Sequence, residues 1–241
     1  MSDILFISDL HLSPERPDII QLCLSFLNKQ AAQAKQLYIL GDFVEYWLGD
    51  DNPDSGIEIV FDKLKQLSEQ GLDIFLMHGN RDFLMGETLA KRCGCQLIND
   101  PYMAEIKGEH VLLMHGDTLC TDDTAYQELR LMLRNPAWQK DFLSKPMSER
   151  QQMALALREK SQQEVQTKDA DIMDVNDDAV KCAFNEHDIQ LIIHGHTHRP
   201  KIHHYDDGNK KLIRIVLGDW YKHGNYLAYN NKQEFKLIDF D

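Results

Sequence analysis

Five short apolar runs in this chain are each followed by a cluster of glycine, carboxylate, imidazole or amide residues. The runs occupy positions 4–7, 37–40, 74–77, 111–114 and 191–193, and the clusters are Asp9-Leu10-His11, Gly41-Asp42, Gly79-Asn80-Arg81-Asp82, His115-Gly116-Asp117 and Gly195-His196-Thr197-His198. Such runs are typical of strands buried on both faces of a sheet. Open α/β sheets bind ligands at the carboxyl ends of their strands. The pattern therefore predicts an α/β fold with polar side chains gathered at one rim.

The segments between the runs predict helices at roughly 17–34, 56–70 and 86–93, and this alternation is typical of helices packed on a sheet. After Pro200 the chain predicts strands at 201–205, 211–218, 226–229 and 234–239, with an Asp-Gly turn at 206–209 that indicates a hairpin. We expect this last part to be antiparallel. With 241 residues, 43% of them hydrophobic, the chain can form a single domain over 1–241.

Positions 121–170 interrupt the strand pattern and predict three successive helices, which we interpret as an inserted helical cap. Asp122 is a candidate N-cap of the first helix, Asn135-Pro136 starts the second, and Ser148 with Gln151 forms a capping box for the third. Positions 123–169 hold eight basic and seven acidic residues. A near-neutral, apolar cap on an acidic body favours a partly apolar, anionic ligand. The alternative is that its apolar residues simply pack on the body.

The composition argues against several classes of protein. A net charge of −13 disfavours broad binding to nucleic acid or to anionic membranes. The five cysteines imply no disulfide pairing, and Cys93-Gly94-Cys95 lacks the second half of a zinc site. The sequence shows no signal peptide and no run of the roughly 18 apolar residues that a membrane span needs. We expect a cytoplasmic protein, at most peripheral to a membrane, with no obligate protein partner.

The polar clusters contain seven candidate metal ligands: Asp9, His11, Asp42, Asn80, His115, His196 and His198. Two pairs have the i, i+2 spacing that places side chains on one face of an extended segment. Oxygen and imidazole ligands without cysteine suit manganese or iron, with zinc as an alternative. Taken alone, each cluster could also be a helix cap or contain a structural histidine. We interpret four further histidines as structural: His110, His194, His203 and His204. Together the clusters predict a two-metal site that hydrolyses a phosphoester or phosphoanhydride with a metal-activated water.

The order of the motifs D-x-H, G-D, G-N-x-D, H-G-D and G-H-T-H resembles the calcineurin-like metallophosphoesterases. This resemblance implies a four-layer α/β/β/α sandwich. It also implies that one ion is held by Asp9, His11, Asp42 and His198. The other would be held by Asp42, Asn80, His115 and His196, with Asp42 bridging the two.

Within that group, the stretches 7–12, 79–84, 115–123, 172–176 and 194–200 are similar to the UDP-2,3-diacylglucosamine pyrophosphatase family of the lipid A pathway in Gram-negative bacteria. This resemblance implies two Mn²⁺ ions per chain and a membrane-embedded UDP-2,3-diacylglucosamine substrate. Attack at the UMP phosphorus would release UMP and 2,3-diacylglucosamine 1-phosphate (lipid X). The resemblance also implies peripheral association with the cytoplasmic face of the inner membrane.

Arg81 stands where many members of the wider group carry a histidine, in G-N-H-[ED]. A histidine can protonate an alkoxide leaving group, whereas a phosphomonoester with a second pKa of about 6 needs no proton. An arginine can stabilise that anion in bidentate geometry, so Arg81 favours an anhydride substrate. The alternative is a salt bridge to Asp82. We expect Arg81 and His196 to act in catalysis.

The same resemblance implies substrate contacts by Asn80, Arg81, Asp123, Ser161, Lys168 and His196, and Arg158 is a further candidate for phosphate. Positions 158, 161, 165 and 168 lie on one face of the third cap helix. Val165 stands where relatives have a polar residue. The alternative for Arg158 and Lys168 is a solvated helix face. Two other functions stay open: a metallophosphoesterase with a soluble substrate, and a scaffold without catalysis.

Overall fold

The computed structural model describes residues 2–52, 56–167, 172, 174–206, 208, 210–230, 232 and 234–241, and for residues 2 and 159–167 it describes the backbone alone. Its larger sheet contains β1 (Ser2–Ile7), β2 (Gln36–Leu40), β3 (Asp73–Met77), β4 (Gln96–Ile98), β10 (Gly224–Asn230) and β11 (Phe235–Phe240). The strand order is β11-β10-β1-β2-β3-β4. β1 to β4 run parallel, whereas β10 is antiparallel to both β1 and β11. The carboxyl ends of β1, β2 and β3 therefore meet at one edge.

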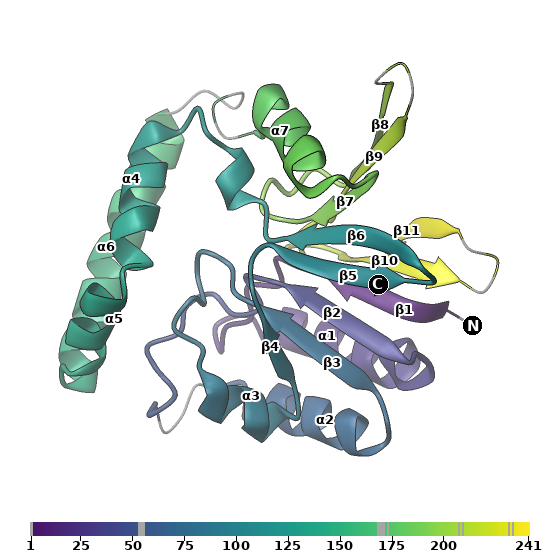
Figure 1. Cartoon of the computed structure of the whole chain (residues 1–241). Coiled ribbons are helices and arrows are strands. Elements are labelled where there is room, and N and C mark those ends of the chain that lie inside the picture. The colour runs from purple at the N-terminus through teal and green to yellow at the C-terminus, as the bar shows by residue number, and fades with distance from the viewer. Residues whose placement is uncertain are drawn as a thin grey trace.

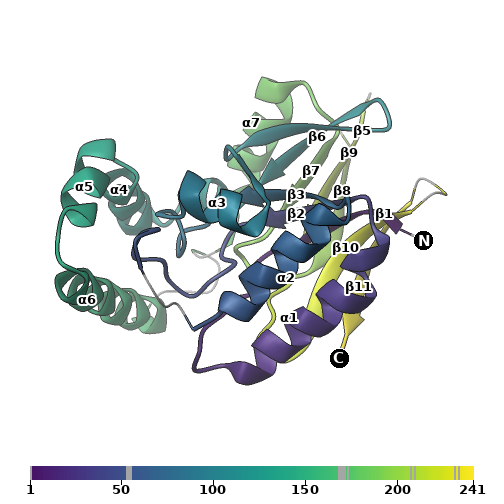
Figure 2. The same cartoon turned by 90° about the horizontal axis from the view of Figure 1, so that it is seen from below.

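The smaller sheet contains β5 (Tyr102–Ile106), β6 (Glu109–Met114), β7 (Leu191–His194), β8 (Lys201–Asp206) and β9 (Lys211–Val216). Its order is β5-β6-β7-β9-β8, in which β6, β7 and β9 run parallel. β5 and β8 are antiparallel edge strands. The two sheets lie face to face, and the helices cover their outer faces (Figures 1 and 2).

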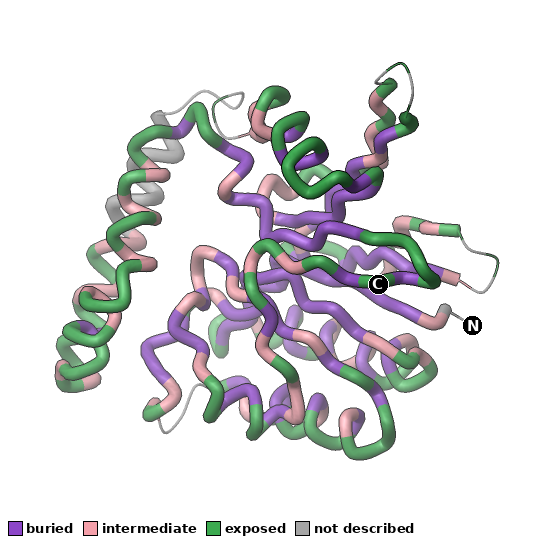
Figure 3. The backbone as a smooth tube through the Cα atoms, in the orientation of Figure 1, coloured by how far each residue is buried: buried purple, intermediate pink, exposed green. Residues whose placement is uncertain are grey.

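Alternating side chains of the strands fill separate cores. Leu5 and Ile7 of β1 pack with α1 (Pro17–Lys29) and α2 (Glu58–Glu69), whereas Ile4 and Phe6 pack between the sheets. α3 (Glu87–Cys93) joins the first of these cores, and α7 (Asp177–His187) covers the smaller sheet through Val180. This period of two is why both sheet faces are apolar, and Figure 3 shows the strands as the buried centre. The four-layer α/β/β/α prediction is confirmed.

Three helices, α4 (Thr124–Leu133), α5 (Pro136–Leu143) and α6 (Met147–Thr167), lie between β6 and α7 in the sequence and stand to one side of the sandwich (Figures 1 and 2). Buried Arg150 of α6 fastens this group to the body. Its guanidinium pairs with Asp51 at 2.6 Å and donates to the Leu48 carbonyl oxygen at 2.9 Å. The charge of Arg150 is thus matched where it is withdrawn from water.

The ends of these helices differ in part from the prediction. Asn135 caps α5 as predicted, and Pro136 occupies its first turn. The cap of α4 is Asp123, whose carboxylate accepts from the Tyr126 backbone N–H at 3.0 Å, and the prediction of Asp122 was wrong. Asp122 instead accepts from the Asn176 side-chain amide. α6 begins at Met147, so Ser148 lies inside the helix.

The predicted antiparallel pairing after Pro200 is confirmed for β8 with β9 and for β10 with β11, but the smaller sheet is mixed. β9 pairs with β7 in parallel, because the chain returns to the smaller sheet between β7 and β8. The short strands β4 and β5 were also missed, since neither is a continuous apolar run. The predicted turn at 206–209 includes residues 207 and 209, which lie outside the described residues.

All five cysteines are free thiols. Cys93 is the last residue of α3, and Gly94 ends that helix in the left-handed conformation, at a φ of 69°, that glycine adopts without strain. Within the described part of the chain, no helix combines the length and hydrophobicity of a membrane-spanning segment.

Candidate metal centre

The seven predicted ligands all lie on the loops that leave β1, β2, β3, β6 and β7 at the shared rim. Five of these loop residues have a left-handed backbone, which is uncommon for residues other than glycine: Asp9, His11, Asp42, His196 and His198. Backbone hydrogen bonds between the loops stabilise this left-handed conformation. The Asp9 N–H donates to the Gly41 carbonyl at 3.1 Å, and the His11 N–H donates to the Asp42 carbonyl at 3.0 Å. Backbone strain of this kind concentrates at functional sites.

Glycines allow these loops to approach one another closely. A Cβ on Gly79 would lie 2.1 Å from Asp42 Oδ1, and a Cβ on Gly195 would lie 2.1 Å from Ser8 Oγ. Gly41 has a φ of 89°, and its own Cβ would meet the His115 ring at 2.6 Å. A side chain at any of these positions would push the ligand residues apart.

The first half of the centre consists of Asp9, His11 and His198, whose ligand atoms lie within 4.8 Å of one another. His198 Nε2 is 3.3 Å from Asp9 Oδ1, and His11 Nε2 is 3.8 Å from Asp42 Oδ2. His11 Nε2 is buried and has no hydrogen-bond partner among the described residues, whereas buried Asp9 Oδ1 has the His198 ring as its ion-pair partner. A buried imidazole nitrogen without a partner is costly. A cation between these two atoms would satisfy both.

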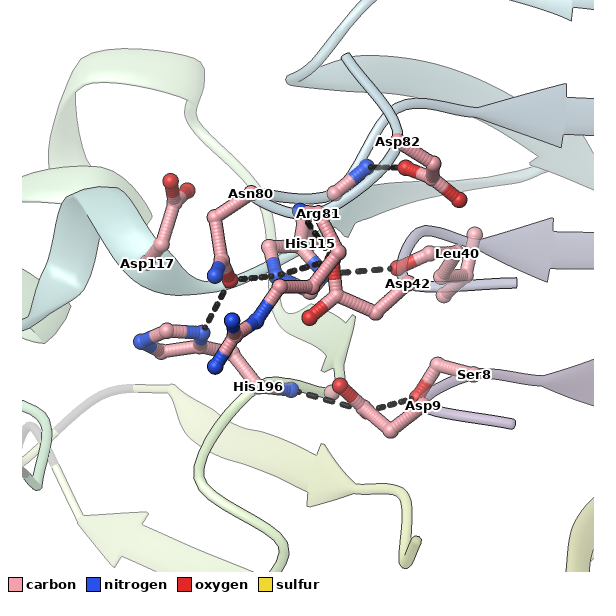
Figure 4. Close-up of polar contacts among 12 residues, drawn as sticks. Ser8, Asp9, Leu40, Asp42, Asn80, Arg81, Asp82, His115, Asp117 and His196 are labelled. Atoms are coloured by element: carbon pink, nitrogen blue, oxygen red, sulfur yellow. Dashed lines mark hydrogen bonds and ion pairs between the residues drawn. The ribbon is translucent and has the colours of Figure 1, made fainter. Parts of the chain in front are cut away.

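The second half consists of Asn80, His115 and His196, which point toward one another (Figure 4). Asn80 Oδ1 lies 2.9 Å from His115 Nε2 and 3.0 Å from His196 Nδ1. His115 Nδ1 lies 3.0 Å from the Leu40 carbonyl oxygen, so this nitrogen is the donor in the neutral ring. Nε2 then has only a lone pair to offer the Asn80 oxygen. His115 must therefore either keep a second proton or bind a cation.

Asp42 lies between the two halves. Its Oδ2 faces His11, whereas its Oδ1 is 3.8 Å from His115 Nε2 and accepts the Arg81 backbone N–H at 2.8 Å. Burial raises the pKa of Asp42 above its ordinary value. A buried carboxylate with one oxygen toward each half has the position of a bridging ligand.

The charges of the centre attract cations. Burial disfavours the charged form of His115 and His198, but neighbouring carboxylates outweigh this effect. Asp42 is the largest of these influences on His115 and raises its pKa to about 9, and Asp219 with Asp9 raises the pKa of His198 to about 10. Burial lowers the pKa of His196 to about 4. Burial opposes ionisation of Asp9, yet the hydrogen bond and charge of His198 hold the pKa of its carboxyl well below its usual range.

Two carboxylates that the prediction missed orient the histidines. Glu45 Oε2 is 3.1 Å from His11 Nδ1, and Asp219 Oδ2 is 3.2 Å from His198 Nδ1. Such partners fix the ring orientation and leave the other nitrogen for a metal. Gly218-Asp219 follows the apolar run of β9, which is the same signal that identified Gly41-Asp42. No comparable pattern surrounds Glu45.

The aspartates of the other motifs hold the rim together. The Asp82 carboxylate accepts the backbone N–H groups of Gly79 and Phe43, both at 2.7 Å. The Asp117 carboxylate accepts from the Tyr126 hydroxyl at 2.6 Å and from Arg130 Nε at 2.7 Å, which ties α4 to the rim. His194 is buried against Gly195 and Arg214, as its structural interpretation predicted.

Arg81 does not pair with Asp82. Among the residues that the structure describes, no carboxylate forms an ion pair with the Arg81 guanidinium, since Asp82 is occupied by backbone donors. The Arg81 side chain lines a cavity of about 250 Å³ between the rim and α4–α6. The wall near the metal centre is polar and includes Glu45, Asn80 and Arg81. The remaining wall is largely apolar and includes Trp47, Leu48, Phe83, Leu84, Leu129, Leu133, Trp138, Phe142, Ala154 and Leu157.

The predicted substrate contacts fall into three groups. Asn80, Arg81 and Arg158 line this cavity, and Arg158 Nη2 pairs with Glu45 Oε1 at 3.2 Å. His196 and Asp123 do not line it, and the Asp123 carboxylate caps α4. Lys168 and the side chains of Ser161 and Val165 lie outside the described residues.

Comparisons with known proteins agree with this geometry. A family model described as calcineurin-like phosphoesterase matches residues 2–200. A protein of Hahella chejuensis (strain KCTC 2396) named UDP-2,3-diacylglucosamine hydrolase is 51% identical over 216 residues, which are 90% of this chain and 88% of that protein. A relative of the same name from Pseudomonas entomophila (strain L48) is 46% identical over 238 residues and covers 99% of both chains.

The solved structure of an archaeal phosphodiesterase has a TM-score of 0.50 to this chain, at 14% sequence identity, and covers 98% of this chain and 99% of the other. That likeness supports the fold alone. The family model spans residues 2–200, which include all five motifs of the rim. The chain therefore belongs to the calcineurin-like phosphoesterase family.

Proposed function

We propose that this chain hydrolyses the pyrophosphate bond of UDP-2,3-diacylglucosamine, releasing UMP and 2,3-diacylglucosamine 1-phosphate, with two Mn²⁺ ions. The observation that carries the proposal is a seven-ligand rim beside a cavity that is polar at the rim and apolar beyond it. A diphosphate at the rim and acyl chains along the apolar wall would fill both parts. The name of relatives that cover nearly the whole chain supports the same substrate.

Asp9, His11, Asp42 and His198 would hold one ion, and Asp42, Asn80, His115 and His196 the other. The partnerless His11 Nε2 fits this role, as do the contact of Asp9 with His198 and the contact between Asn80 and His115. Two such ions, when bound, neutralise phosphoryl oxygens and supply an activated water as nucleophile. Glu45, Asp219 and the Leu40 carbonyl keep the three imidazoles aimed at the ions.

Arg81 would stabilise the leaving phosphate, because its guanidinium faces the cavity without a carboxylate partner among the described residues. A phosphomonoester leaves without a proton, so a cation suffices. His196 stays neutral at physiological pH and would contact the transferred phosphoryl group beside Asn80. To contact the phosphate, Arg158 would have to break its ion pair with Glu45.

The helices α4–α6 would form a cap over the lipid part of the substrate, as an insertion of about 121–170 in a single domain of 1–241. Its surface carries Leu131 and Leu155, which are 71% and 54% exposed. Side chains of this kind support peripheral attachment of the cap to the cytoplasmic face of the inner membrane, where a membrane-embedded substrate would be reached.

The test is hydrolysis of UDP-2,3-diacylglucosamine in detergent with Mn²⁺, followed by ³¹P detection in ¹⁸O-water. We expect ¹⁸O in UMP and much faster turnover than for UDP-N-acetylglucosamine or bis-p-nitrophenyl phosphate. Equal rates on the three would favour an enzyme with a soluble substrate. No hydrolysis of any phosphate ester would favour a scaffold.

We expect Mn²⁺ binding to release about two protons near pH 7.5. His115 and His198 have raised pKa values of about 9 and 10, so both are protonated in the metal-free protein at that pH and must lose a proton to become ligands. Affinity should then fall about 100-fold per pH unit as the pH is lowered from 8.5 to 7.5. Titration calorimetry in two buffers of different ionisation enthalpy measures the release. Identical heats in both buffers would contradict it.

Replacing Asp219 by asparagine should weaken Mn²⁺ binding by about 10- to 100-fold, because His198 loses the carboxylate that orients its ring. Turnover should recover in part at saturating Mn²⁺. Asp188→Asn is the matched control, since Asp188 is an exposed aspartate that pairs with Lys210. Unchanged Mn²⁺ affinity in Asp219→Asn would remove Asp219 from the metal centre.

A further inference from the structure

A second cavity, of about 640 Å³, opens beside the metal centre. His198, Asp219 and Tyr221 form its inner wall, and Lys222, His223 and Asn225 continue it toward the start of β10. The function proposed above accounts for the lipid and the diphosphate, but it leaves the nucleoside of the substrate without a binding site.

The order of strands places the two cavities on opposite sides of the metal centre. In the larger sheet β10 neighbours β1 on one side, whereas β2 and β3 follow on the other (Figure 1). The second cavity is lined by residues between β9 and β10, and the cap cavity by residues that follow β2 and β3. His198 belongs to the second cavity and contacts Asp9, whereas Asn80 belongs to the cap cavity and contacts His115. A diphosphate across the centre would point one substituent into each cavity.

The two walls differ in chemistry. The cap cavity beyond the rim is lined mainly by aromatic and aliphatic side chains, together with Arg130, Arg134 and Arg158, whereas Asp219, Asp239 and Asp241 lie in the wall of the second cavity. Asp219 pairs with His198, Asp241 pairs with His223, and Asp239 accepts from the Asn225 side-chain amide. Their remaining lone pairs can accept further hydrogen bonds from hydroxyl and N–H groups. The wall therefore fits a neutral group that is rich in donors.

Tyr221 offers an aromatic surface at the point where this cavity meets the metal ligands. The side chain is 48% exposed. Its ring packs on His11, with centroids 5.6 Å apart and planes 13° from parallel, and lies 5.9 Å from the His198 ring. A tyrosine held by two ligand imidazoles and partly open to solvent is suited to stack with a planar base.

We propose that the second cavity binds the uridine end of the substrate, with the base stacked on Tyr221 and the ribose hydroxyls directed at the carboxylates of the wall. This inference rests on the proposed function, because it assigns a site to one part of that substrate. Tyr221 would be a specificity-determining residue for the nucleotide, and it would have no part in lipid binding.

The test compares three inhibitors of UDP-2,3-diacylglucosamine hydrolysis by the Mn²⁺-loaded protein: UMP, ribose 5-phosphate and lipid X. We expect UMP to inhibit at about tenfold lower concentration than ribose 5-phosphate, because only UMP has a base to stack. Tyr221→Ala and Tyr221→Leu should remove this preference and leave lipid X inhibition unchanged, whereas Tyr221→Phe should keep it. Tyr221→Leu retains an apolar side chain against His11, and Mn²⁺ stoichiometry is measured for each variant.

Tyr46→Ala is the matched control, because Tyr46 is 46% exposed and lines the cap cavity. Its preference for UMP over ribose 5-phosphate should equal that of the wild type. If the wild type hydrolyses the substrate but shows no such preference, or if Tyr221→Leu retains it, the uridine site is wrong and the proposed function stands. If the wild type does not hydrolyse the substrate at all, the proposed function is wrong and the uridine site with it.

Discussion

Replacing Asp42 by asparagine is expected to lower turnover by about 10³-fold or more. The two cations would stabilise the transition state by several kcal/mol, and losing that stabilisation corresponds to a factor of this size. Asp42 is the residue with one oxygen toward each half of the centre. An asparagine has the same shape and can still accept the Arg81 backbone N–H. It lacks the charge and the second anionic oxygen that a bridging ligand needs.

The same substitution should not destabilise the metal-free protein at pH 7. Burial raises the pKa of Asp42, so its ionised form is less favourable in the folded state than in the unfolded state. This cost is absent below the ordinary pKa of an aspartate and grows as the pH rises toward the raised value. At pH 7 asparagine avoids this cost but also loses the attraction of the Asp42 carboxylate for protonated His115. Because the two effects oppose each other, thermal unfolding in a chelator should show a midpoint close to that of the wild type.

Asp62→Asn is the control for Asp42, because Asp62 is an exposed aspartate on α2. It should retain wild-type turnover and Mn²⁺ stoichiometry. Two tightly bound Mn²⁺ ions and near wild-type turnover in Asp42→Asn would exclude Asp42 as the bridge. A large loss of stability in the metal-free variant would show that Asp42 has a structural role instead.

The predictable part of this molecule follows from local patterns. The runs before Asp9, Asp42 and Asn80 are apolar at every position, and each is a strand with one set of side chains toward the helices and the other between the sheets. Parallel strands then bring their carboxyl ends together without further information. The positions of all seven proposed ligands at one rim therefore followed from the sequence.

Contacts between distant segments were not predictable in this way. Glu45 orients His11 and pairs with Arg158 of α6, more than a hundred positions further along the chain, and no periodicity relates these residues. The sequence pattern also could not decide which of two similar neighbouring residues would cap a helix. Asp122 and Asp123 are both good N-caps, and the choice between them depends on Asn176, which takes the side chain of Asp122.

Replacing Arg81 by alanine is expected to reduce kcat/KM for UDP-2,3-diacylglucosamine by about 10²- to 10³-fold, which is the usual loss for one donor to a developing anion. Mn²⁺ stoichiometry should stay unchanged, since the contact of Arg81 with a proposed ligand, Asp42, is made by its backbone N–H, which alanine keeps. Arg81→Lys should recover part of the activity, because lysine restores the charge without the bidentate geometry. Arg92→Ala, at an exposed arginine on α3, is the control and should keep wild-type kinetics.

A second substrate separates two roles for Arg81. If its guanidinium stabilises the departing phosphate, the loss should be much larger for the anhydride than for bis-p-nitrophenyl phosphate, which expels a phenolate and no phosphate. If Arg81 only attracts anionic substrates to the rim, the two losses should be alike. The absence of an ion-pair partner for this guanidinium among the described residues, and its place in the cavity wall, favour the first outcome. Wild-type kinetics of Arg81→Ala on both substrates would exclude Arg81 from the reaction.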